Sequence, residues 1–152
     1  MQFLNDYSNR ELNIWAELVL DIIVSLYFIS RVYPLLINDQ FNSEALLPII
    51  FTNIIISIIY SIIVFGAIDI FTKKEKKDER DYFYELKSYR ISYYLSQGGI
   101  LCIIFLIAYN AVYQENIGLL TLPKIAMIFF IIAVLSSAGK SLTQLFNYRK
   151  SI

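Results

Sequence analysis

Two carboxylates are the residues of this sequence whose type and position most clearly suggest chemistry. Glu17 and Asp21 lie inside a long apolar segment, four residues apart, so they share one face of a helix, which Ser25 continues. A carboxylate inside a membrane is costly unless it is paired, protonated or hydrated. The two acids therefore predict a partly hydrated network that fixes helix packing, a cation path lined by carboxylates, or a proton relay.

Three more polar residues interrupt the other apolar segments. Asn53 lies in the second segment, Gln97 in the third and Lys140 in the fourth. Amide and ammonium groups at such positions need hydrogen-bond partners, because hydrocarbon offers none. Together with Glu17 and Asp21, these three residues form the predicted pore or polar network.

The composition excludes several kinds of site. The chain has no histidine, and Cys102 is its only cysteine. One chain therefore cannot form a Cys/His zinc site, an internal disulfide, or a Ser-His-Asp or Cys-His catalytic unit. No Gly-rich phosphate-binding loop occurs either. We expect a protein that is not an enzyme and that uses neither a metal nor a cofactor.

The apolar residues come in blocks that fit a membrane. The chain has 152 residues, of which 57% are hydrophobic, whereas a soluble domain is about 45–50% apolar. Each block is long enough to cross a hydrocarbon core about 30 Å thick, which takes roughly 20 helical residues. We predict an all-α integral membrane protein with a single four-helix transmembrane domain over residues 1–152. Its expected spans are residues 14–37, 45–71, 91–113 and 119–142.

Charged residues concentrate in a bridge between the second and third spans, at residues 73–90. No Gly or Pro interrupts residues 73–97, so we expect a helical bridge that continues directly into the third span and extends it into the cytoplasm. The basic residues of the bridge either set topology and attract anionic headgroups, or bind a cytoplasmic protein or a nucleotide. Neighbouring acids weaken the case for nucleic acid. The predicted ligand or partner residues are Lys73, Lys74, Lys76, Lys77, Arg80, Lys87 and Arg90.

The distribution of Lys and Arg also predicts the orientation of the chain. Both residue types are abundant in the bridge and in the C-terminal tail, whereas the two other short loops have none, apart from Lys124 at the start of the fourth span. Short loops rich in Lys and Arg face the cytoplasm. We therefore predict a multi-pass protein with both termini in the cytoplasm.

One stretch of the bridge carries a resemblance. The sequence KKDERDYFYELKSYRISYY is similar to the signature of small, uncharacterised bacterial membrane proteins with four spans, in which a DER motif precedes the third span. A tail like LFNYRK, at Leu145–Lys150, is similar as well. The resemblance implies a bacterial inner-membrane location and brings no activity with it. The matching bridge residues are Asp78, Glu79, Arg80, Lys87 and Arg90.

Two functional hypotheses follow from these features. The first is a small oligomeric channel or membrane-permeabilising effector with an acid-lined path, which a cytoplasmic ligand or partner gates. Bacterial immune systems use small membrane effectors of this general design, which is an analogy and not a motif match. The alternative is a non-conducting membrane scaffold or regulatory subunit that docks a cytoplasmic partner through the bridge. Because several spans carry polar residues, we expect a homo-oligomer in the lipid bilayer.

Overall fold

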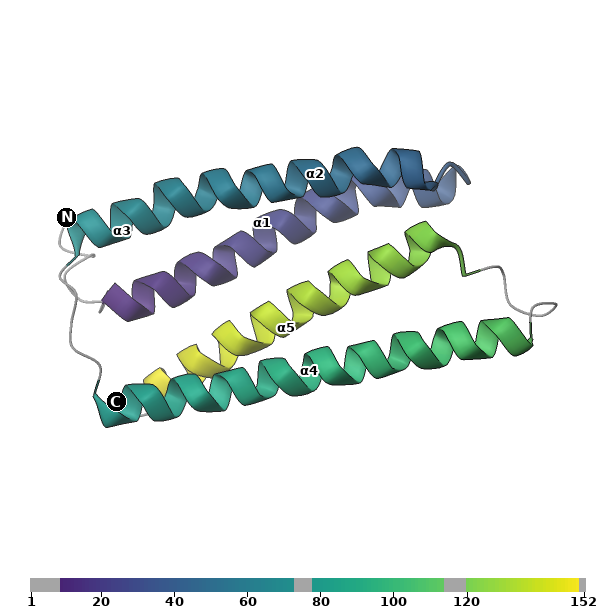
Figure 1. The fold of residues 1–152 in the computed structure, drawn as a ribbon. Helices are drawn as coiled ribbons and strands as arrows, with labels where there is room; N and C mark the ends of the chain where they lie inside the picture. The colour runs from purple at the N-terminus through teal and green to yellow at the C-terminus, as the bar shows by residue number, and fades with distance from the viewer. Residues whose placement is uncertain (1–8, 73–77, 114–119, 151–152) are drawn as a thin grey trace.

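The computed structural model describes residues 9–72, 78–113 and 120–150. All regular structure in these residues is helical, and the second helix contains a short π-helical segment, η2. The elements α2, η2 and α3 follow one another without a gap, so they form one rod over Ser43–Phe71. This confirms the predicted all-α fold with four helices long and apolar enough to cross a membrane. The elements are α1 (Asn9–Ile37), α2 (Ser43–Tyr60), η2 (Ser61–Phe65), α3 (Gly66–Phe71), α4 (Glu79–Val112) and α5 (Leu122–Lys150) (Figure 1).

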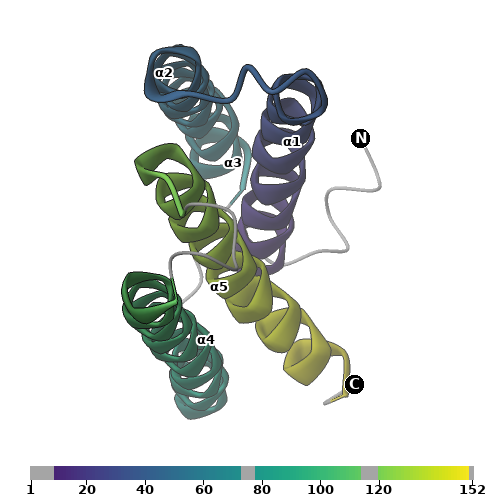
Figure 2. The same ribbon diagram turned by 90° about the vertical axis from the view of Figure 1, so that its right-hand side faces the viewer.

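The last helix, α5, occupies the centre of the arrangement. It packs against α4 on one side and α1 on the other, while α2 packs mainly on α1 (Figures 1 and 2). The helices therefore do not close into a compact square bundle, since α4 and α1 do not pack along their lengths. The outer surfaces of α2 and α4 remain largely exposed in one chain.

The seam between α4 and α5 depends on two glycines that allow the backbones to approach closely. A Cβ atom on Gly99 would lie 2.6 Å from Ile132 Cγ2, and one on Gly139 would lie 2.6 Å from Leu95 Cδ1. Between these contacts, the Ser136 hydroxyl lies 2.7 Å from the hydroxyls of both Ser92 and Ser96. Small residues and short hydroxyl contacts are typical of helix packing in lipid.

An apolar core holds α1, α2 and α5 together near the loop between the first two helices. Phe28 and Val32 of α1 are buried against Leu46 and Ile49 of α2. On the α5 side, the rings of Phe28 and Phe130 stack with their centroids 4.0 Å apart. The contact among α1, α2 and α5 at this end is therefore formed mainly by apolar side chains.

Of the charged bridge, residues 73–77 lie outside the described residues, and from Glu79 onward the bridge is helical. Asp78 caps the helix: its Oδ1 accepts a hydrogen bond of 2.8 Å from the Asp81 amide, and its own amide donates to Asp81 Oδ2 at 2.9 Å. This capping box satisfies backbone N–H groups that a helix start leaves free, and it places negative charge at the positive end of the helix dipole. From Glu79, α4 runs without a break into the apolar stretch, as predicted. α5 also extends beyond the expected end of the fourth span near Leu142, to Lys150.

The two neighbouring glycines of α4 allow a matched test of this packing. Gly99→Leu should destabilise the protein by about 1–3 kcal/mol, because the side chain would overlap Ile132 and force α4 and α5 apart. Gly98→Leu should have little effect within one chain, since a Cβ there meets no atom within 4 Å. Thermal unfolding in detergent, followed by circular dichroism, measures both. Equal stability of the two variants would contradict the close approach at Gly99.

Candidate functional site

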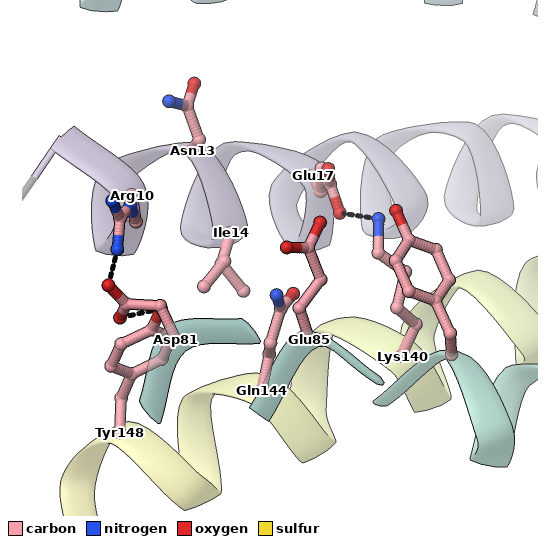
Figure 3. A pocket seen from close by; sticks show the side chains of 10 residues that line it. Arg10, Asn13, Ile14, Glu17, Asp81, Glu85, Lys140, Gln144 and Tyr148 are labelled. Carbon is pink, nitrogen blue, oxygen red and sulfur yellow. Dashed lines mark hydrogen bonds and ion pairs between the residues drawn. The ribbon is translucent and has the colours of Figure 1, made fainter. Parts of the chain in front are cut away.

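A charged cavity of about 160 Å³ lies where α1 and α4 begin and α5 ends. Figure 3 shows side chains from all three helices converging on it, with Glu85 and Gln144 between two ion pairs. Its lining contains three carboxylates and two basic groups, so it carries more negative than positive charge. The lining residues are Arg10, Asn13, Ile14, Glu17, Asp81, Glu85, Tyr89, Lys140, Gln144 and Tyr148.

The inner ion pair joins the first and last helices. Lys140 Nζ lies 2.9 Å from Glu17 Oε2, and Ser141 Oγ donates a second hydrogen bond to the same oxygen at 3.2 Å. The ammonium also lies 5.3 Å from the centre of the Tyr89 ring, where a cation–π contact is favourable. Both charged side chains are shielded from solvent over most of their surface. Glu17 is thus partnered within its own chain.

The outer ion pair lies about two helical turns nearer the start of α1 than Glu17, and its side chains are no more exposed than those of the inner pair. Arg10 of α1 pairs with Asp81 of α4, and the Tyr148 hydroxyl of α5 donates a hydrogen bond of 2.7 Å to Asp81 Oδ1. Asp81 therefore connects three helices while it also completes the capping box of α4. We did not predict Arg10, Asp81 or Tyr148 as site residues, because nothing in their local sequence indicates that they meet.

Asp21 extends the charged region one helical turn further along α1. Ser137 of α5 is a hydrogen-bonding neighbour of the carboxylate, and Glu17 and Lys140 are the nearest charged groups. One carboxylate oxygen, Oδ2, is buried and has no hydrogen-bond partner. Ser25, on the same face, does not supply one, because its hydroxyl donates to the Asp21 backbone carbonyl at 2.6 Å. A buried oxygen left in this state calls for a water molecule, a proton or a cation.

Beyond Asp21, the interface between α1 and α5 becomes apolar. A second cavity of about 160 Å³ follows there, lined almost wholly by hydrocarbon. The stacked Phe28 and Phe130 rings form part of its wall. The polar route from the charged cavity therefore ends near Ser25. The residues lining the second cavity are Ser25, Phe28, Ile29, Phe130, Ile131, Val134 and Leu135.

Two members of the predicted polar network lie elsewhere. Asn53 is 3% exposed in α2, and neither its Oδ1 nor its Nδ2 has a hydrogen-bond partner, but it does not line the charged cavity. Gln97 is exposed on α4, and no described residue hydrogen-bonds to its side chain. The structure thus brings together Glu17, Asp21 and Lys140, and it separates them from Asn53 and Gln97.

The three predicted ligand residues of the bridge that the structure describes do not line this cavity. Arg80 Nε is 3.5 Å from Asp78 Oδ2 in an exposed ion pair, and Lys87 Nζ donates to Asn147 Oδ1 at 3.2 Å. Arg90 is exposed. The remaining four predicted residues, Lys73, Lys74, Lys76 and Lys77, lie outside the described residues.

Within residues 9–72, 78–113 and 120–150, no three His, Cys, Asp or Glu side chains are grouped so that they could hold a metal ion.

No protein family, curated protein or solved structure matches the chain. The fold by itself defines a multi-pass membrane protein with four apolar helices. The resemblance carried by the DER motif is supported only at the level of this four-span plan.

A double-mutant cycle can measure the inner ion pair. Glu17→Gln and Lys140→Met should each destabilise the protein, because each leaves the other charge without its partner in a poorly hydrated site. The double variant should be more stable than the sum of the single effects predicts, by about 0.5–3 kcal/mol. Chemical unfolding in detergent measures the four proteins.

Glu44→Gln provides the control acid, because Glu44 lies in the first turn of α2, far along the chain from Lys140 and outside the lining of the cavity. Combined with Lys140→Met, it should give additive effects within about 0.5 kcal/mol. If the effects of Glu17→Gln and Lys140→Met on the free energy of unfolding were additive, the result would contradict an interaction between Glu17 and Lys140.

Proposed function

We propose that this protein is a small membrane channel whose cation path follows the α1–α5 interface past Glu17 and Asp21. The observation that carries the proposal is the buried, unpartnered oxygen of Asp21, one helical turn beyond the charged cavity. A carboxylate in this position is stabilised by a cation or a proton that arrives through the cavity. The surplus of carboxylates in the lining favours cations over anions.

The geometry corresponds to a closed path with two obstacles. The Lys140 ammonium next to Glu17 repels cations, and the stacked rings of Phe28 and Phe130 close the route beyond Asp21. Hydrophobic constrictions of this kind gate channels because water leaves them. Opening therefore requires α1 and α5 to separate near Phe28. In the permeabilising-effector form of the proposal, a ligand or partner at the cytoplasmic bridge triggers that separation.

The observation that favours the scaffold alternative is the Glu17–Lys140 pair itself. A neutralised pair that links the first and last helices also suits a polar network whose role is to hold the bundle together. In that case the cavity conducts nothing, and the charged start of α4 serves only to dock a partner. Ion flux separates the two hypotheses.

We further propose that copies associate in one membrane with both termini in the cytoplasm, through the outer surface of α4. Six residues spaced four and three apart form a line along this helix, and its large side chains are 64–73% exposed. This spacing is typical of helices that pair along their length. Gln97 flanks the line, and an amide of a second copy could satisfy its hydrogen bonds. The line consists of Tyr94, Gly98, Leu101, Phe105, Ala108 and Val112.

Cysteine cross-linking tests this association. In a Cys102→Ser background, Leu101→Cys should form a disulfide-linked dimer under mild oxidation in membranes, because the line brings the two copies of position 101 within disulfide range. Ile107→Cys, an exposed position on another face of α4, should cross-link weakly. Adding Gly98→Leu should reduce the Leu101→Cys dimer without unfolding the chain. Equal cross-linking at positions 101 and 107 would contradict association of two copies through this line of residues.

Flux through liposomes tests the channel. Asp21→Asn should lower cation flux by roughly tenfold, equivalent to about 1.4 kcal/mol in the barrier, because it removes the charge that attracts the ion. Glu44→Gln should leave flux unchanged. Phe28→Ala should raise flux by removing half of the ring stack. If neither the native protein nor Phe28→Ala conducts, while both remain folded by circular dichroism, the channel proposal fails and the scaffold is favoured.

A further inference from the structure

A groove of about 470 Å³ opens between α4 and α5 on the side away from the charged cavity. Its walls combine one charged, two polar and three apolar residues. Lys87 and Glu85 are two residues apart, roughly 200° around a helix, so the groove and the cavity occupy opposite sides of α4. The groove is therefore separate from the proposed ion path. Its lining residues are Lys87, Ile91, Leu142, Thr143, Phe146 and Asn147.

The polar end of the groove carries a positive charge that nothing in the lining neutralises. Lys87 Nζ donates to Asn147 Oδ1 at 3.2 Å, and the Asn147 amide, 8% exposed, is fixed by a hydrogen bond of 2.7 Å to the Thr143 carbonyl. Asn147 is neutral, so it positions the ammonium without cancelling its charge. An ammonium has three donors, which leaves donors for a further acceptor. No carboxylate lines the groove.

The remaining walls are apolar and exposed. Leu142 and Phe146 of α5 are 56% and 67% exposed, and Ile91 of α4 is 36% exposed. Lys87 belongs to the charged beginning of α4, whereas Ile91 lies one turn further along, at the expected start of the membrane span. Because α5 runs antiparallel to α4, Ile91 and Leu142 lie on the apolar side of Lys87, whereas Phe146 lies beside Asn147 at the level of the cation.

We propose that this groove binds an anionic phospholipid, with its phosphate on the Lys87 ammonium, its glycerol region against the Phe146 ring, and an acyl chain along Ile91 and Leu142. The charge selects an anionic headgroup, since a zwitterionic lipid brings a second, positive group toward Lys87. The apolar wall selects a lipid over a soluble nucleotide, which would leave that wall uncovered. The proposal does not depend on ion conduction.

Native mass spectrometry of the full-length protein in detergent tests the site. Phosphatidylglycerol and phosphatidylcholine with identical chains are titrated separately. The native protein should bind phosphatidylglycerol more tightly, and Lys87→Gln should lower that affinity by roughly fivefold, the value of one basic contact at a membrane surface. Lys87→Arg should retain the affinity for phosphatidylglycerol, because it keeps the positive charge. Arg80→Gln is the matched control, because Arg80 is an exposed base of the same helix that pairs with Asp78.

Two further measurements make the outcome decisive. Phe146→Ser should weaken phosphatidylglycerol binding while the thermal unfolding temperature changes little, because Phe146 is mostly exposed. Glycerol phosphate, which has the anionic group without acyl chains, should not displace the lipid. Equal binding of the two lipids, equal losses from Lys87→Gln and Arg80→Gln, or full displacement by glycerol phosphate would each overturn the proposal.

Discussion

The arrangement of this protein depends on the pairing of Glu17 with Lys140. The two residues belong to the first and last helices, and their charges meet at 2.9 Å inside a site shielded from most solvent. Separating them would leave each charge in poorly hydrated surroundings, which is far more costly than breaking an exposed pair. Satisfying both charges requires α1 and α5 to lie side by side over this region. α5 also packs against α4, so it occupies the centre of the molecule, and α2 and α4 are the outer helices.

The two ends of the α1–α5 interface are stabilised by different kinds of interaction. At the charged end, ion pairs and the hydrogen bond from Tyr148 to Asp81 join three helices. At the other end, Phe28 and its apolar neighbours pack without polar atoms. Polar contacts fix which helices meet, whereas apolar packing excludes water. The interface between α1 and α5 is therefore polar at one end and apolar at the other, and both ends are formed by side chains of these two helices.

The sequence was sufficient to predict the helices, because four apolar blocks of membrane length admit few other structures. It was also sufficient to place Glu17 and Asp21 on one face. It could not show which face of each helix meets which neighbour. Gln97 and Asn53 are both amides in apolar segments, yet Gln97 faces outward and Asn53 is buried. Helical periodicity gives no such distinction when almost every surrounding residue is apolar. The structure places Lys140 beside Glu17, and this partner could be identified only from the packing of α1 against α5.

A buried polar atom without a hydrogen-bond partner has different consequences in Asn53 and in Asp21. Both have buried atoms without hydrogen-bond partners. For the neutral amide of Asn53, the cost is that of a lost hydrogen bond, about 1–3 kcal/mol, and a water molecule can remove it. For a carboxylate, the remedy is positive charge. Lys140 interacts with both carboxylates, and it forms its ion pair with Glu17. One ammonium shared by two carboxylates leaves a negative charge that a proton or a cation can balance, and the channel proposal therefore depends on Asp21 rather than on Asn53.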